Sequence, residues 1–157
     1  MAREFISIPD QTVQPGANVL FESDGYPINR GYIYHRVGSG QIKLASPSLM
    51  GVRYSCRCGN MPLADYLVEF HGNVQIPEGG TVAQISLSIL SDGDIDAGGI
   101  MLTTPTAVEI PENVGASIVA TIPWICRCSN VSVRNTGTEA VQIVNGGLII
   151  DYAGIRR

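Results

Sequence analysis

The chain has 157 residues, with 14 acidic and 10 basic side chains, a formal net charge of −4 and a pI near 5.0. A nucleic-acid-binding protein needs a basic stripe that neutralises phosphates, so this charge argues against that class. No apolar run is long enough to cross a membrane, and Met1–Phe5 lacks the apolar core of a signal peptide. We therefore expect a protein that is made in the cytoplasm and leaves it only by cell lysis.

Charged side chains are scarce for a globular protein. They make up 15% of the chain, against about a quarter in ordinary globular proteins. Two explanations stay open: neutral polar residues cover the surface, or other subunits bury part of it.

Short runs of apolar or alternating residues follow one another along the chain, separated by turn-forming residues. No segment shows helical periodicity over three turns, so the pattern predicts about ten short strands and an all-β antiparallel β-sandwich or jelly roll. Immunoglobulin-like sandwiches share these local signals, and the strand order therefore stays open. In chain order, the predicted strands are residues 5–8, 18–21, 31–37, 41–44, 52–56, 65–76, 83–89, 100–104, 117–122, 124–133 and 141–152.

The predicted domain organisation is simple. We expect residues 1–12 to form an N-terminal arm or a short strand, and residues 13–157 to form a single jelly-roll domain. The last predicted strand is expected to contain a β-bulge at Asn145–Gly147, where a turn-like sequence interrupts the apolar pattern.

The clearest alternation begins at Asp65. Alternate residues up to Ile76 are mostly apolar and the others are mostly polar, which predicts a strand with one buried face and one wet face. Pro77–Gly80 has the composition of a tight turn, and the pattern resumes at Ala83. We therefore predict a hairpin around this turn. The apolar residues of its first strand that share one face are Tyr66, Val68, Phe70, Val74 and Ile76.

All four cysteines of the chain occur in a repeated Cys-Arg-Cys tripeptide, as Cys56, Cys58, Cys126 and Cys128. In a strand, residues two apart share a face, so each pair would present two thiols side by side. Three interpretations stay open: reduced, half-buried cysteines, disulfides that join the two motifs, or a four-thiolate metal site. The short spacing weakens the metal site, since zinc ligands usually have two or more residues between paired cysteines. We expect no cofactor.

Other polar groups give no catalytic constellation. The segment that begins at Asp92 resembles the start of a calcium loop but lacks the later glutamate, so we expect a solvated hairpin tip at Ser91–Gly99. His35 and His71 are the only histidines, and no nucleophile or metal motif accompanies them. Ser39 lies between Gly38 and Gly40, and a hairpin turn explains this sequence without a catalytic role for the serine. The sequence therefore predicts a protein that is not an enzyme.

Four stretches resemble the small jelly-roll proteins of tailed bacteriophages, which are similar in plan to tumour-necrosis-factor-like domains. They are Val13–Phe21, Gly31–Gly40, Tyr66–Val74 and Val131–Thr136. The resemblance implies a homotrimeric, non-enzymatic virion protein that decorates the capsid or forms a head fibre. It implies the chain itself and the major capsid protein as partners, and the capsid surface as location.

Two hypotheses extend this resemblance. In the first, Phe5, Ile6 and Ile8 belong to an arm that adds a strand to an exposed edge of the capsid or of a neighbouring subunit. In the second, the same fold is a carbohydrate- or receptor-binding module that uses Ser91–Gly99 and Ser46–Gly51 to bind a host-surface glycan. A trimer would also explain the apolar residues on the second sheet face, which are Leu67, Val82 and Leu90.

Overall fold

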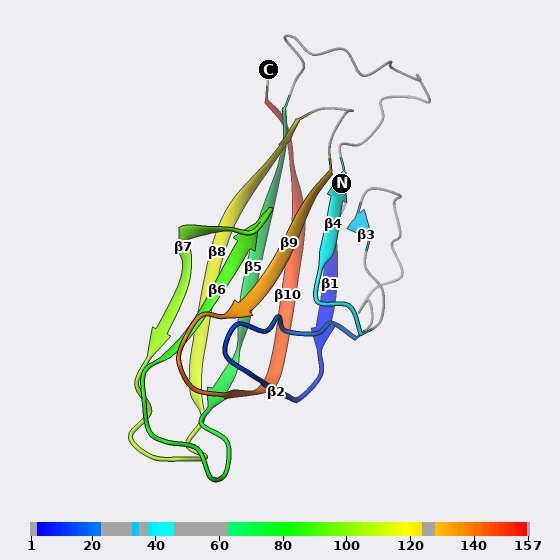
Figure 1. The fold of residues 1–157 in the computed structure, drawn as a ribbon. Coiled ribbons are helices and arrows are strands. Elements are labelled where there is room, and N and C mark those ends of the chain that lie inside the picture. Colours follow the sequence, from blue (N-terminus) through cyan, green and yellow to red (C-terminus); the bar gives the residue numbers. More distant parts are fainter. Residues whose placement is uncertain (1–2, 23–32, 35–37, 46–62, 124–127, 157) are drawn as a thin grey trace.

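The computed structural model describes residues 3–22, 33–34, 38–45, 63–123 and 128–156. Every regular element in these ranges is a strand, which confirms the all-β prediction (Figure 1). No helix that could span a membrane occurs in this part of the chain. The strands are β1 (Arg3–Ile8), β2 (Gln11–Val13), β3 (Ile33–Tyr34), β4 (Ile42–Ala45), β5 (Leu63–Gln75), β6 (Ile85–Ser91), β7 (Asp94–Thr103), β8 (Glu112–Pro123), β9 (Cys128–Asn135) and β10 (Val141–Arg156).

The strands form two antiparallel sheets that pack face to face. Sheet I has the order β1-β10-β5-β8, with β2 also paired to β10, and sheet II has the order β3-β4-β9-β6-β7. The chain passes from one sheet to the other after β2, β4, β5, β7, β8 and β9. This repeated crossing between two antiparallel sheets is the jelly-roll arrangement that the sequence predicted.

The predicted hairpin around Pro77–Gly80 is wrong. The turn itself is present, because the Gly80 N–H donates to the Pro77 carbonyl at 2.9 Å and Gly79 has a φ of 78°. However, β5 lies in sheet I and β6 lies in sheet II, so the loop between them carries the chain across the sandwich. Local turn chemistry predicts a reversal of direction and does not determine which strands pair.

The tip of the next connection is a true hairpin. β6 and β7 pair in sheet II around Asp92 and Gly93, which both have positive φ angles of 53° and 84°. Positive φ at both central residues is typical of the two-residue turn whose twist matches a β-hairpin. The predicted solvated tip is thus shorter than Ser91–Gly99, because β7 already begins at Asp94.

The predicted bulge in the last strand is confirmed. The register between β10 and β5 shifts between Val144 and Gly147. Before the shift the buried side chains of β10 are Val141 and Ile143, and after it they are Leu148 and Ile150. The bulge therefore changes the parity of the strand, so that both halves direct apolar side chains into the core.

The local geometry explains why the bulge lies at this sequence. Asn145 has a φ of 54°, and its N–H donates to the Asp10 carboxylate at 3.0 Å. On the facing strand, a Cβ at Gly72 would lie 2.9 Å from the Cα of Gly146. Asparagine tolerates positive φ, and glycine alone permits this backbone approach.

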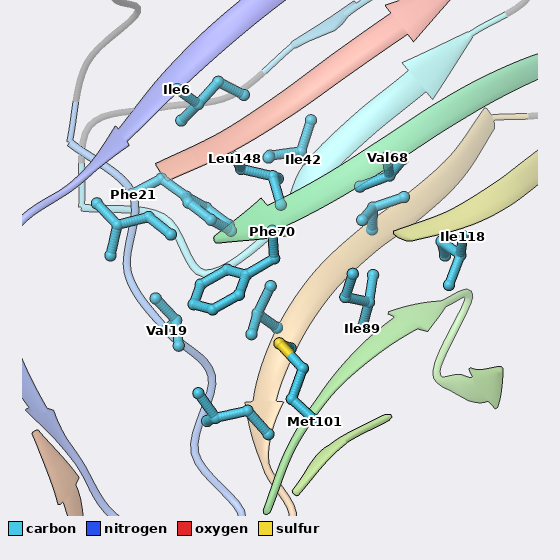
Figure 2. Packing of buried hydrophobic residues seen from close by; sticks show 14 of the residues in the cluster. Ile6, Val19, Phe21, Ile42, Val68, Phe70, Ile89, Met101, Ile118 and Leu148 are labelled. Atoms are coloured by element: carbon cyan, nitrogen blue, oxygen red, sulfur yellow. The ribbon is translucent and has the colours of Figure 1, made fainter. Parts of the chain in front are cut away.

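The core lies between the two sheets (Figure 2). Sheet I contributes Val68 and Phe70, sheet II contributes Ile42 and Ile89, and the segment between β2 and β3 contributes Phe21. The predicted buried face of β5 is confirmed in full, since Tyr66, Val68, Phe70, Val74 and Ile76 are all buried.

A fully buried amide joins three segments at one end of the core. The Asn135 side chain is 0% exposed. Its Nδ2 donates to the carbonyls of Val13 and Glu139, both at 2.9 Å, and its Oδ1 accepts from the Gly137 N–H at 3.0 Å. Its own N–H donates to the Ala17 carbonyl at 3.0 Å. The side chain therefore satisfies three backbone groups, of which the Val13 carbonyl is buried and the other two are partly buried.

The N-terminal segment belongs to the sandwich. β1 pairs with β10 from Arg3 to Ile8, and β2 continues along the same strand, so no break in the fold occurs at residue 13. Ile6 and Ile8 are buried in the core and only Phe5 is exposed, at 37%. The hypothesis of a capsid-binding arm therefore needs correction: Ile6 and Ile8 could contact a capsid only if β1 left the sheet.

The Phe5 ring rests on a glycine of the neighbouring strand. A Cβ at Gly147 would lie 2.9 Å from the Phe5 Cζ, and the two residues lie in neighbouring rows of the β1–β10 pair. The absence of a side chain at Gly147 thus makes room for the ring.

We expect Asn135→Ala to lower the free energy of unfolding by roughly 3 kcal/mol, since about 1–3 kcal/mol is lost for each buried backbone group that loses its partner. Asn130→Ala is the matched control, because Asn130 lies on the same strand with an exposed side chain, and it should change the value by about 0.5 kcal/mol or less. Urea denaturation followed by circular dichroism measures both variants. Equal effects would contradict the role of Asn135.

We expect Gly147→Ala to displace the Phe5 ring and to loosen β1, with faster amide hydrogen exchange in β1 than in β5. The free energy of unfolding should fall by about 1 kcal/mol, as for other overpacked positions. In a Phe5→Ala background the same change should cost almost nothing. An equal cost in both backgrounds would show that the ring is not the obstacle.

Candidate subunit interface

The outer face of sheet I combines apolar and polar side chains. We call this surface the open face. Its outward residues alternate with the core residues of the same strands, as the period of a strand requires. They include Phe5 and Ser7 on β1, Gly147, Ile149 and Asp151 on β10, Leu67, Glu69 and His71 on β5, and Ser117 and Val119 on β8.

One apolar residue from each strand forms a diagonal band across the open face. Phe5 lies opposite Ile149, and Leu67 lies opposite Val119. Ile149 and Leu67 lie on the adjacent strands β10 and β5 in neighbouring rows of the same face. We call Phe5, Ile149, Leu67 and Val119 the apolar band. Val119 is 56% exposed and Phe5 is 37% exposed, so the band is accessible in the isolated chain.

The centre of the open face contains His71. Its cross-strand partners are Gly147 on β10 and Gly115 on β8. The Phe5 ring occupies the space above Gly147. This ring leans toward His71, with 6.3 Å between the ring centroids. His71 itself is exposed.

Amide side chains occupy one end of the open face. Gln75 Nε2 donates to Gln142 Oε1 at 2.9 Å, and Asn113 Nδ2 donates to Asn73 Oδ1 at 3.3 Å. These groups are polar but uncharged. At the other end, Thr121 donates to the Asp65 carboxylate at 2.7 Å.

The side of the sandwich formed by β7 and β8 is a second apolar surface. The two strands are the edges of their sheets and lie side by side (Figure 1). On β7, Ile100 and Leu102 are 40% and 56% exposed. They alternate with the buried Met101 and therefore point outward from sheet II, whereas Val119 on β8 points outward from sheet I. A Cβ at Gly99 would lie 2.8 Å from Cγ2 of Ile118, which shows how closely β7 packs on β8.

The edge of β8 lacks the usual protection against strand addition. From Asn113 to Pro123 the strand has no charged residue, and it pairs only with β5 among the described strands. Natural proteins usually protect such edges with charges, bulges or a covering element. No lysine or arginine occurs between Arg57 and Arg127, so β5 to β8 carry neither of these residues.

The structure gives the acidic hairpin tip a structural role. The Asp92 carboxylate accepts from Ser129 Oγ and from the Asn130 N–H, both at 2.9 Å. These bonds fasten the β6–β7 turn to the start of β9. Among the described residues, no group of three or more potential metal ligands occurs. The glycan-binding hypothesis stays a prediction, and Ser46–Gly51 lies outside the described residues.

Most of the predicted cysteine site lies outside the described part of the chain. Cys56, Cys58, Cys126 and His35 lie outside the described residues, and of Cys128 only the backbone is described, opposite Ala45. The interpretations of the cysteines therefore stay predictions. Ser39 follows a turn at Gly38 and forms a single β-bridge with Phe21, and its hydroxyl exchanges hydrogen bonds with the backbone of Gln41.

The sequence located the open face only in part. Of the three second-face residues, Leu67 lies on it, Leu90 is buried at 1% exposure and Val82 lies in the β5–β6 loop. Ile149 and Val119 were missed, because each lies in an apolar run in which no single parity stands out. The register of β10, β5 and β8 is what brings them into one band.

Comparisons with known proteins agree with this architecture. No protein-family model matches the chain, and no curated protein matches it. Among solved structures, the chain is similar to the globular domain of zebrafish complement 1qA protein, with a TM-score of 0.63, 10% identity and 100% coverage of both chains. It is also similar to the Eiger TNF of S. frugiperda, with a TM-score of 0.64, 9% identity, and coverage of 97% of this chain and 92% of that one. At this identity the likeness shows the fold, and the chain therefore has a jelly-roll fold like that of C1q and tumour-necrosis-factor domains.

Proposed function

We propose that this chain is a non-enzymatic structural subunit that assembles as a homotrimer through its open face and decorates the head of a tailed bacteriophage. The observation that carries the proposal is the presence of two different apolar surfaces on one sandwich, the apolar band and the β7–β8 side. The trimer number and the virion location rest on the sequence resemblance.

Two different surfaces suit a head-to-tail contact between copies. When the β7–β8 side of one chain packs on the open face of the next, each chain uses both surfaces once, and the assembly can close into a ring. Such packing would cover Ile100 and Leu102 of one chain and Leu67 and Ile149 of its neighbour. It would also cover the uncharged edge of β8, and it would account for the low share of charged residues.

The partner on the head is the major capsid protein in this proposal. Its support is the resemblance of Val13–Phe21, Gly31–Gly40, Tyr66–Val74 and Val131–Thr136 to small phage jelly-roll proteins, together with the fold. Because Ile6 and Ile8 are buried, the contact would use surfaces other than the core side of β1.

We expect Val119→Lys to weaken self-association by about 1–3 kcal/mol per interface without unfolding the chain, since it places a charge in the apolar band at an exposed position. Val82→Lys is the matched control, because Val82 is similarly exposed, at 45% against 56% for Val119, but lies in the β5–β6 loop. Light scattering over a range of concentrations gives the native mass. A monomeric wild-type chain would overturn the trimer, and equal effects of both variants would overturn the assigned surface.

The virion proposal predicts that the purified trimer co-sediments with heads of the encoding phage that lack this protein, and that it saturates at a fixed number of trimers per head. Val82→Lys should bind as wild type does, because it leaves the assembly intact. Failure to bind heads, combined with binding to host-surface glycans on an array, would replace this function by the glycan-binding alternative.

A further inference from the structure

We propose that Asn145, in the bulge of β10, is a site of spontaneous covalent modification. Its side-chain amide is lost as ammonia, and the residue becomes a mixture of aspartate and isoaspartate. The modification needs one chain alone, so it depends neither on the trimer nor on the virion.

The chemistry needs an asparagine whose following backbone nitrogen can reach its side chain. The Gly146 nitrogen gives up its proton to water or hydroxide and bonds to Cγ of Asn145, while the bond from Cγ to the side-chain nitrogen breaks. That nitrogen takes up a proton and leaves as ammonia, and a succinimide ring remains. Water opens the ring at Cγ to give aspartate, or at the backbone carbonyl to give isoaspartate, whose main chain runs through Cβ and Cγ. One water is consumed for each ammonia released.

The residue after the asparagine distinguishes Asn145 from every other described asparagine. Asn145 is followed by glycine, which has no side chain to shield its backbone nitrogen. The others are followed by valine or threonine, whose branched Cβ crowds the nitrogen. They are Asn18, Asn73, Asn113, Asn130 and Asn135.

The side chain of Asn145 is free to react. Asn145 is exposed, and its side-chain amide has no hydrogen-bond partner among the described residues. The side chain of Asn130 is likewise exposed and without such a partner, but the next residue is the buried Val131. Asn130 is therefore the matched internal control for the effect of Gly146.

The backbone at this point is held weakly. Neither Asn145 nor Gly146 has a partner on β5, because the register shifts between Val144 and Gly147. On the other side, Gly146 pairs with Ile8, the last residue of the edge strand β1. Ring closure requires a rotation of the backbone at Asn145, and this rotation opens only the end of an edge strand. Such local openings cost far less free energy than global unfolding, so the folded chain can react.

The fold itself requires this reactive pair. Asn145 has a φ of 54°, a conformation that asparagine tolerates better than most residues. A Cβ at Gly146 would lie 2.9 Å from Cγ2 of Ile143 and 3.2 Å from Cβ of Ile8. The bulge that directs both halves of β10 into the core therefore brings an asparagine and a glycine together.

Both products disturb the bulge. Aspartate adds a negative charge to the residue whose N–H binds the Asp10 carboxylate at 3.0 Å, so two like charges become neighbours. Isoaspartate lengthens the main chain where the register changes. We therefore expect modified chains to hold β1 and β2 less firmly on β10.

Mass spectrometry of the folded chain, aged at neutral and at mildly alkaline pH, tests the proposal. Cleavage after Arg127, Arg134 and Arg156 places Asn130 and Asn145 in separate peptides. We expect Asn145 to convert first and faster at the higher pH, because the Gly146 nitrogen must lose its proton. An isoaspartate-specific methyltransferase should label the same peptide. Asn145→Gly should lose this labelling and keep the fold, since glycine adopts positive φ freely.

Three outcomes would overturn the proposal or its consequence. Conversion of Asn130 at the rate of Asn145 would remove the role of Gly146. An unchanged Asn145 in the folded chain, together with conversion in urea, would show that the fold protects this residue. Modified chains can be separated by their added negative charge, and amide hydrogen exchange should then be faster in β1 and β2 than in unmodified chains. Equal exchange would contradict the expected loosening.

Discussion

The bulge in β10 determines which side chains point to each face of sheet I. Without the register shift between Val144 and Gly147, one half of the strand would direct its apolar residues to solvent, because a slip of one residue exchanges the faces of a strand. With it, Leu148 and Ile150 enter the core while Ile149 joins the open face. The shift depends on the close approach of Gly72 to Gly146 and on the Asp10 carboxylate that binds the Asn145 N–H. The same bulge therefore places apolar side chains both in the core and on the candidate interface.

The open face and the β7–β8 side differ in width and in the residues that they carry. The face is wide, has interior strands at its centre and combines an apolar band with paired amides. The side is narrow and ends in an uncharged strand edge. Surfaces that differ in this way fit the proposed head-to-tail assembly better than a two-fold dimer. The amides can add directional hydrogen bonds to an otherwise apolar contact.

Residue patterns predicted the strands well and their partners poorly. The alternation in β5 located its buried face residue by residue, and the Asn145–Gly147 composition located the bulge. Pairing across Pro77–Gly80 was predicted wrongly, because a turn sequence contains no information about which sheet the next strand joins. Asn135 shares parity with the buried Val131 and Val133, and a polar residue at a core position was the available signal for its role. The apolar band could not be predicted, because it depends on the registers of four strands.

The uncharged edge of β8 affects how separate copies of the chain interact. A newly made copy presents an uncharged, β-branched strand edge to every other copy nearby, and such an edge accepts added strands with little discrimination. In the proposed assembly a neighbouring copy covers this edge, so assembly would itself lower the tendency of the chain to aggregate.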